Sequence, residues 1–392
     1  MIILRVACNN LFMFKNFEVD FTYDRKSNHL LSENDKLFIG SNIRVRKNLI
    51  IMGANASGKT TFGKLLCLIF NFIYGNDLSN NSFDFSSTIY DCTEDSNLEV
   101  EFVIDDKAYL LRVCFRNNGL WSEEVYKQKI YKYYDIQTLR EKLKSNAPIQ
   151  TYKRGKTLFN IGYKSYAFSS AKELMDLRLK IGFLFRFSER PLNSSTYLGE
   201  LNFKLINDLL PRIDNSVANV NRLIAVGENT KTPETKSYLI TFNNNESVTV
   251  PEGDLSHCDE RLSHGTREAI DFLSAFDTLS KKNSFFFYFD ERLSHMHSEL
   301  EAYFIYQAFS RKLPDSQVFF TTHNTELLDL NAPITTFLFF RRNDKGFNEV
   351  VYPSKVFRKN IRDLRMHYEN DYFGVLPDYS VLDELFEENS HV

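Results

Sequence analysis

Hydrophobic and polar residues alternate in two parts of the chain, and hydrophobic residues form continuous runs in three others. The alternation within residues 1–22 and over 97–127 predicts antiparallel strands separated by turns. The continuous runs lie at Lys47–Met52, Ser284–Glu291 and Gln317–Asn324. Each run is typical of a strand that is buried on both faces, as in a parallel sheet.

Helical periodicity follows and separates these strands. An apolar helix should begin near Lys59, and further helices are predicted over 266–279 and 298–312. A hairpin and a basic helix are predicted to finish the chain. Because strands and helices alternate at both ends of the sequence, the pattern predicts an α/β fold.

The predicted core is interrupted in its middle. Residues 1–127 should form its first half with an antiparallel sub-sheet, and residues 251–392 its second half. Residues 128–250 are predicted to be an insertion that is partly helical, with a strand at Ser237–Phe242. A length of 392 residues exceeds what one hydrophobic core usually supports, which agrees with this elaboration.

Composition argues against several classes of protein. The net charge of −3 gives no overall cationic field for nucleic acid or an anionic membrane, although a local basic patch stays open. The longest apolar run, Leu65–Tyr74, is too short to cross a bilayer, and the N-terminus lacks the plan of a signal peptide. Five scattered cysteines form neither a zinc motif nor a disulfide framework. We therefore expect a soluble cytoplasmic protein without a membrane partner.

The segment Gly53–Thr60 reads GANASGKT and fits the phosphate-binding pattern G-x-x-x-x-G-K-[ST] at every fixed position. It lies between a predicted strand and a predicted helix, which makes a chance glycine turn the weaker explanation. In such a loop the backbone N–H groups surround the phosphates, Lys59 neutralises them, and the Thr60 hydroxyl coordinates Mg²⁺. The sequence thus predicts a site for ATP and Mg²⁺, formed by Gly53, Asn55, Ser57, Gly58, Lys59, Thr60 and Thr61.

Two acids end the second buried strand. Asp290 and Glu291 lie where α/β sheets place ligands, at the carboxyl end of a strand. We predict that Asp290 holds Mg²⁺, directly or through water, and that Glu291 orients and deprotonates the attacking water. The alternative is that both acids only begin a loop or cap the next helix, and the phosphate-binding motif upstream weakens it.

His323 occupies the corresponding place after the third buried strand. It follows Asp290 by 323 − 290 = 33 residues, the length that a parallel crossover through one helix requires. From there it can contact the γ-phosphate and the attacking water. A purely structural histidine is the alternative, and we predict the catalytic role because of the position.

The stretch Leu262–Thr266 reads LSHGT and opens a predicted helix. Ser263 can simply cap that helix, because its hydroxyl can accept a hydrogen bond from a first-turn N–H group. A helix N-terminus is also an anion site. The residues alone leave both roles open.

Together these motifs resemble the ABC-type ATPases, in the soluble branch that includes the RecF, SMC and OLD proteins. Leu262–Thr266 is similar to the divergent S-x-G-T form of the ABC signature, and Ile3–Phe21 to the opening of that branch. His367–Ser380 resembles the ending of bacterial anti-phage ATPases of the PARIS, AbiL-like and Septu-type systems. The resemblance implies an ABC-type P-loop core, with a mixed sheet, helices on both of its faces and an antiparallel sub-sheet.

The resemblance also implies partners. In this family the signature contacts the nucleotide held by a second subunit, so Ser263 and Gly265 would act in trans within a homodimer or higher homo-oligomer. The protein would be an ATP-hydrolysing sensor or regulatory scaffold for a separately encoded effector, a nuclease or toxin, in anti-phage defence. The alternative is a RecF-like DNA-repair ATPase that binds DNA structures. An ABC transporter motor fits less well, because motors lack so large an insertion.

The predicted C-terminal helix leaves nucleic acid open as a partner. Its basic residues share one face at helical spacing, which suits nucleic acid or an acidic protein. A solvated helix face is the commoner explanation of such a pattern. The basic residues concerned are Lys355, Arg358, Lys359, Arg362 and Arg365.

Overall fold

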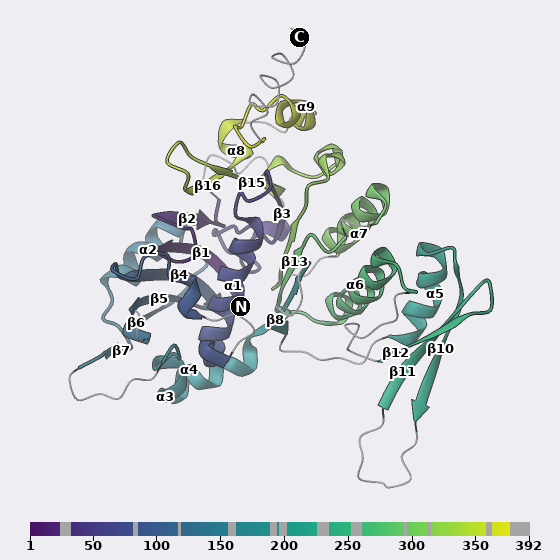
Figure 1. Cartoon of the computed structure of the whole chain (residues 1–392). Helices are drawn as coiled ribbons and strands as arrows, with labels where there is room; N and C mark the ends of the chain where they lie inside the picture. Colours follow the sequence, from purple (N-terminus) through teal and green to yellow (C-terminus); the bar gives the residue numbers. More distant parts are fainter. Residues whose placement is uncertain are drawn as a thin grey trace, which may run out of the picture.

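Three β-sheets organise the chain (Figure 1). The structure is a computed structural model, and it describes residues 1–23, 33–80, 85–116, 119–155, 162–188, 194–195, 202–225, 235–251, 261–293, 296–311, 315–357 and 363–376.

A seven-stranded sheet lies at the centre, in the order β16-β15-β3-β14-β13-β8-β9. Its five inner strands run parallel, and an antiparallel strand closes each edge. All three strands predicted from continuous apolar runs are confirmed in it. The strands are β3 (Asn48–Met52), β8 (Gly182–Phe187), β9 (Ser194–Ser195), β13 (Phe285–Asp290), β14 (Gln317–Thr321), β15 (Phe337–Arg342) and β16 (Asn348–Val351).

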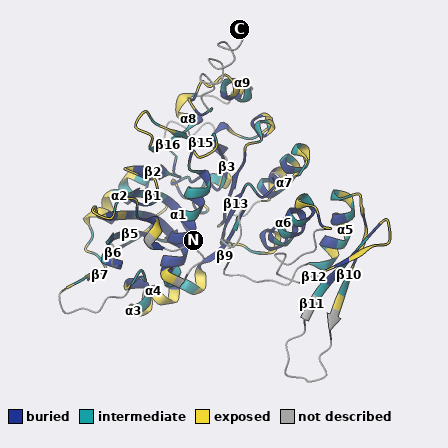
Figure 2. Ribbon diagram, viewed as in Figure 1, coloured by how far each residue is buried: buried dark blue, intermediate teal, exposed yellow. Residues whose placement is uncertain are grey.

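Helices cover both faces of this sheet because its inner strands are apolar on both. From β13, Phe286 packs against Phe70 of α1 (Lys59–Tyr74), with ring centroids 4.5 Å apart. On the opposite face, Phe289 of the same strand packs against Phe272 of α6 (His264–Lys281), with ring centroids 5.5 Å apart. The helix α7 (Ser298–Ser310) shares the second core with α6. The central strands β13 and β14 are buried at every position (Figure 2), and the predicted mixed sheet with helices on both faces is confirmed.

A six-stranded antiparallel sheet packs on the outer side of α1. Phe62 of α1 meets Phe17 of this sheet at 6.0 Å between centroids, so α1 lies between the two sheets. The predicted antiparallel sub-sheet is confirmed. Its strands, in spatial order, are β2 (Phe17–Asp20), β1 (Ile2–Asn9), β4 (Ser96–Ile104), β5 (Lys107–Arg116), β6 (Gly119–Lys129) and β7 (Gln150–Lys153).

The region predicted as an insertion, 128–250, contributes to all three sheets. It supplies β7 to the six-stranded sheet, β8 and β9 to the central sheet, and a separate antiparallel sheet of its own. Residues of this region belong to both hydrophobic cores of the molecule. The division of the chain at residues 128 and 250 stays a prediction. The helices and the third sheet of this region are α2 (Ile136–Ser145), α3 (Ala167–Ser170), α4 (Lys172–Asp176), α5 (Phe203–Ile213), β10 (Val217–Ala225), β11 (Thr235–Phe242) and β12 (Ser247–Pro251).

The single basic C-terminal helix was predicted wrongly. Lys355 lies in α8 (Pro353–Val356), which ends after one turn because Phe357 adopts an extended backbone conformation. Arg365 lies in a separate helix, α9 (Leu364–Glu369), and pairs with acids of its own chain at 2.7 and 3.0 Å. These local ion pairs favour a solvated face. Arg358, Lys359 and Arg362 lie outside the described residues.

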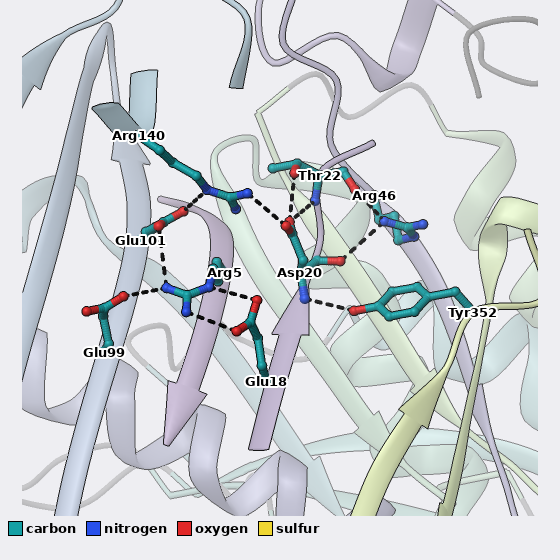
Figure 3. A network of polar contacts seen from close by, with 9 residues as sticks. All are labelled: Arg5, Glu18, Asp20, Thr22, Arg46, Glu99, Glu101, Arg140 and Tyr352. Carbon is teal, nitrogen blue, oxygen red and sulfur yellow. Dashed lines mark hydrogen bonds and ion pairs between the residues drawn. The ribbon is translucent and has the colours of Figure 1, made fainter. Parts of the chain in front are cut away.

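A polar network ties the six-stranded sheet to the central one (Figure 3). The carboxylate of Glu101, with a side chain only 2% exposed, pairs with Arg140 at 2.7 Å and lies 3.5 Å from Arg5. Arg140 also donates to Asp20 at 2.9 Å. The backbone N–H of Asp20 donates to the Tyr352 hydroxyl at 2.8 Å, and Tyr352 follows β16. Burial raises the pKa of Glu101, and the two arginines oppose that effect.

Replacing Arg140 with Ala should lower the free energy of unfolding by about 2–3 kcal/mol at neutral pH, because it leaves the Glu101 charge buried with a more distant partner. The loss should shrink as the pH falls towards the raised pKa of Glu101, since protonation removes that charge. Chemical denaturation of Arg140→Ala, with Glu101→Gln as the rescuing second change, measures this. The matched control is Arg112→Ala. It breaks the ion pair with Glu99, in which the Arg112 side chain is 40% exposed, and should cost less than about 1 kcal/mol. Equal losses in the two variants would contradict the argument.

Candidate active site

The order of the central sheet brings the predicted motifs to one edge. β14 lies between β3 and β13, with Thr321 opposite Ile51 on one side and Asp290 on the other. All three strands run parallel, so the segments that follow them meet at the same end. The P-loop after β3, the two acids at the end of β13 and His323 after β14 are therefore adjacent.

The P-loop needs glycine at two positions. Gly53 has φ 149°, and a Cβ there would lie 2.2 Å from the backbone carbonyl oxygen of Phe340. Gly58, at the start of α1, has φ 102° and would bring a Cβ to 2.7 Å from Nδ2 of Asn348. The loop thus has a backbone shape that leaves Asn55 exposed and ends in a left-handed glycine at the start of α1. This shape suits phosphate binding by backbone N–H groups.

Residues far along the sequence fix this loop, and sequence reasoning missed them. Asn348 of β16 donates a hydrogen bond to the carbonyl of Ser57. Arg342 Nε donates to the carbonyl of Ala56 at 3.2 Å, and the N–H of Ala54 donates to the carbonyl of Val375 at 3.1 Å. Only spatial proximity connects them with the motif, so no sequence spacing could have identified them.

Lys59 is the cation of the site. Its side chain is 4% exposed, and its Nζ donates to the carbonyls of Gly53 at 2.9 Å and Ala54 at 3.1 Å. Its Nζ also lies 3.6 Å from Oε1 of Glu291. Burial lowers the pKa of Lys59, while Glu291 and Asp290 oppose that shift. An anion that competes for Lys59 would therefore replace contacts that the chain now makes with itself.

Asp290 carries a carboxylate oxygen suited to a cation. Thr321 donates to its Oδ1 at 2.7 Å, whereas its Oδ2 is buried with no hydrogen-bond partner in the described part of the chain. Burial raises the pKa of Asp290 to about 6, against the effects of Thr321 and Thr60. A buried carboxylate oxygen beside a threonine hydroxyl fits Mg²⁺, which prefers hard oxygen ligands. Ser57 Oγ, in the loop itself, is a second buried polar atom without a hydrogen-bond partner among described residues.

Replacing Asp290 with Asn should stabilise the nucleotide-free protein by about 2 kcal/mol at pH 7.5. The pKa of Asp290 is above its ordinary value, so the cost of ionising it in the folded protein grows as the pH rises from about 4 to about 6, is complete above pH 6, and is absent once the carboxyl is protonated in both states. The gain should therefore vanish near pH 4. Thermal melts at both pH values test this. The same variant should lose the stabilisation that MgATP gives the native chain, and a lower melting temperature at pH 7.5 would contradict the assignment.

Glu291 and His323 face each other across the edge of the sheet. Oε1 of Glu291 lies 2.7 Å from Nε2 of His323, and this contact is the main reason that the pKa of Glu291 is lowered. Glu291 has φ 49°, a conformation rare for a residue with a side chain, and its N–H donates to Thr321. Strained backbone of this kind is frequent at functional sites. An ionised Glu291 held beside Lys59 and His323 can accept a proton from a water molecule.

A buried glutamate that sequence reasoning missed positions the segment around His323. Glu301 of α7 accepts a hydrogen bond from the Thr322 hydroxyl at 2.7 Å and one from Nδ2 of Asn324 at 3.0 Å. These residues flank His323 on both sides, so Glu301 fixes the backbone that presents the imidazole. The position of Glu301 inside an amphipathic helix gave no signal of this role.

The predicted signature residues lie at the start of α6. Ser263 is the N-cap, and its Oγ accepts a hydrogen bond from the N–H of Thr266 at 3.1 Å. The predicted cap is thus confirmed, and Gly265 follows in the first turn. Because α6 and α1 lie on opposite faces of the central sheet, the signature and the P-loop belong to different faces of one chain (Figure 1).

Three glutamines lie between the P-loop and the signature in the sequence, which gives them no role: Gln128, Gln137 and Gln150. They lie in β6, α2 and β7, outside the central sheet. On the side away from β14, β13 pairs with β8, and the last residue of β8, Phe187, lies opposite Asp290.

Comparisons with known proteins find a matching family. Residues 49–329 match the family model described as "AAA domain, putative AbiEii toxin, Type IV TA system", and this range includes every residue predicted for the nucleotide site. No curated protein matches the sequence. In the described part of the chain, no helix combines the length and apolar character needed to cross a membrane.

Several solved structures are similar over most of their length. One is the Smc head domain with a coiled coil and joint derived from Pyrococcus yayanosii, at 9% identity and a TM-score of 0.49, covering 95% of this chain and 99% of that one. Another is the Smc head domain bound to the C-terminal domain of ScpA derived from Pyrococcus furiosus, at 12% identity and 0.47, covering 91% and 97%. A third is RecF with ATP, at 12% identity and 0.43, covering 89% and 97%.

Proposed function

The chain belongs to the AAA domain family whose description names a putative AbiEii toxin, and from this premise we propose that it is an ATP-hydrolysing switch of the ABC type. The proposal rests on one cluster at the edge of the central sheet, formed by Lys59, Asp290, Glu291 and His323. In this cluster Oδ2 of Asp290 is buried and has no hydrogen-bond partner in the described part of the chain.

Each residue of the cluster has a distinct task. The P-loop N–H groups and Lys59 bind the β- and γ-phosphates. Thr60 and Asp290 hold Mg²⁺, which when bound neutralises charge on the phosphate oxygens. Glu291 orients the attacking water and takes its proton, and His323, 2.7 Å from Glu291, keeps that carboxylate in place and contacts the γ-phosphate.

The second half of each site would come from a second copy of the chain. Ser263 and Gly265 begin α6 on the opposite face of the sheet from α1. A head-to-tail pair of chains with two-fold symmetry would place each signature against the nucleotide of the other chain. The helix N-terminus would then add its partial positive charge to that of the P-loop.

We place the switch upstream of a separately encoded effector, a nuclease or toxin, in anti-phage defence. The family description supports this, because it refers to toxin and toxin–antitoxin proteins. The ATP-bound and nucleotide-free states would differ in whether two chains are joined, and the effector would read that difference.

The test is a purification of the native complex under two nucleotide conditions. The tagged Glu291→Gln variant, expressed from its own operon, should retain one neighbouring gene product in MgATP and release or rearrange it in MgADP. Lys59→Ala should abolish the difference between the nucleotides. A salt-sensitive, tight complex of the ATP-bound variant with duplex DNA alone, without any protein partner, would instead favour a DNA-repair ATPase.

A further inference from the structure

The signature serine takes part in a relay of hydroxyl groups that ends on another element. Oγ of Ser263 lies 2.6 Å from Oγ1 of Thr266, and Thr266 donates a hydrogen bond to Oδ2 of Asp214. Asp214 is the C-cap of α5, in the short connection between α5 and β10. The signature is therefore connected through side chains to the three-stranded sheet.

The hydrogen bonds of this relay run in one direction, from Ser263 through Thr266 to Asp214. Burial alone would raise the pKa of Asp214, but hydrogen bonds from Ser216 and Thr266 outweigh it and lower the pKa, so the carboxylate is ionised and can only accept. Thr266 has one hydroxyl proton, and it is given to Asp214. The close contact between Ser263 and Thr266 then requires the proton of Ser263, since each hydroxyl has only one to donate.

A second contact attaches the signature to the same end of the three-stranded sheet. Nε of Arg261 lies 2.7 Å from Glu246, in the turn between β11 and β12, and the guanidinium lies over the ring of Phe242 at 4.4 Å. The N–H of Asn243 in this turn donates to the carbonyl of Ser216, which follows Asp214. The base of the sheet and the start of α6 thus form one connected unit.

We propose that Asp214 is a positioning residue that retains the hydroxyl proton of Ser263 within its own chain, so that the three-stranded sheet controls when the signature can donate to the nucleotide of a second copy. The inference rests on the proposed trans role of Ser263. With the relay intact, Ser263 accepts from the N–H of Thr266 and donates to its hydroxyl. A displacement of the sheet that separates Asp214 from Thr266 lets Thr266 turn its proton to Ser263, and Ser263 can then donate to a phosphate oxygen. A ligand or partner that moves the sheet would act as the trigger.

The experiment measures ATP-driven dimerisation in the Glu291→Gln background, where hydrolysis does not remove the ligand. Sedimentation equilibrium in saturating MgATP gives the dimer dissociation constant. Asp214→Ala should lower that constant about tenfold, because a hydrogen bond of ordinary strength no longer competes with the phosphate. Thr266→Val should do the same from the other side of the contact, which guards against a folding defect peculiar to either variant.

The controls separate this role from a structural one. Ser216→Ala removes a 2.6 Å bond to the other carboxylate oxygen of Asp214, and Thr266→Ser keeps the relay hydroxyl; neither should change the constant. Ser263→Ala should weaken the dimer, and adding Asp214→Ala to it should then give no gain, since the proton concerned is absent. Tighter dimers from Asp214→Ala even without Ser263, or weaker dimers from both relay variants, would overturn the inference. If Ser263→Ala alone leaves ATP-driven dimerisation intact, the proposed trans role of Ser263 is wrong and the inference about Asp214 is wrong with it. If Ser263→Ala weakens the dimer but Asp214→Ala does not tighten it, only the inference about Asp214 is wrong.

Discussion

Glu291→Gln should slow ATP turnover about 10³-fold while ATP binding is retained. The Glu291 carboxylate has a lowered pKa and lies beside His323 and Lys59, whereas Lys59 is itself a cation and Oδ1 of Asp290 already accepts a hydrogen bond from Thr321. The amide of Gln keeps the size of the side chain and can still meet His323, so the loss reports the proton transfer and not the shape of the site. Single-turnover hydrolysis and equilibrium binding of a fluorescent ATP analogue measure the two quantities separately.

Two variants frame this result. Glu299→Gln neutralises an exposed acid in the first turn of α7, eight residues further along, and should keep native turnover. Lys59→Ala should lose binding itself, because it removes the cation that meets the phosphates. If Glu291→Gln hydrolyses ATP at the native rate, another group deprotonates the water and the assignment of Glu291 is wrong. If it fails to bind ATP at all, its role is structural.

The part of the site that could be predicted from sequence is the part in which short segments follow buried strands. Continuous apolar runs identify β3, β13 and β14, and the polar residue after such a run must lie at a strand end. Asp290, Glu291 and His323 were predicted in this way, and Lys59 from the glycine-rich motif that follows β3. The order of the strands was not predicted, yet it matters: β14 lies between the other two and lets Thr321 bond both Asp290 and the backbone of Glu291.

The parts that were missed depend on contacts without a sequence spacing. β8 is an apolar run as clear as the others, but it lies in a region interpreted as an insertion, and only its pairing with β13 shows that it belongs to the central sheet. Asn348 and Glu301 are single polar residues in ordinary strand and helix patterns, and their roles depend on which backbone atoms they meet. The role proposed for Asp214 likewise depends on its hydrogen bond from Thr266, which no sequence spacing indicates.

A mixture of two inactive variants should recover activity if the signature works in trans. Lys59→Ala lacks a working P-loop, and Ser263→Ala lacks a working signature; each homodimer contains two defective sites. In a mixed dimer the intact P-loop of one chain meets the intact signature of the other, and the second site carries both defects. At chain concentrations high enough to keep both variants paired, equal amounts that assort at random give one good site in half of the dimers, and hence about a quarter of native turnover, if the sites act independently.

This recovery distinguishes the two geometries that the position of α6 leaves open. Loss of a donor to the transferred phosphate costs on the order of 10²–10³ in rate, so the separate variants should be nearly silent and the mixture conspicuous. If Ser263 served the nucleotide of its own chain, every mixed dimer would carry one defect per site and the mixture would stay inactive. The double variant Lys59→Ala/Ser263→Ala mixed with native chains is the matched control. Its native homodimers alone give about a quarter of native turnover, its mixed dimers add nothing under the trans arrangement, and they add about another quarter under the cis arrangement. About a quarter of native turnover in the first mixture, together with no more than about a quarter in the second, therefore requires that each ATP be held between two chains, with Ser263 facing the phosphate that Lys59 of its neighbour binds.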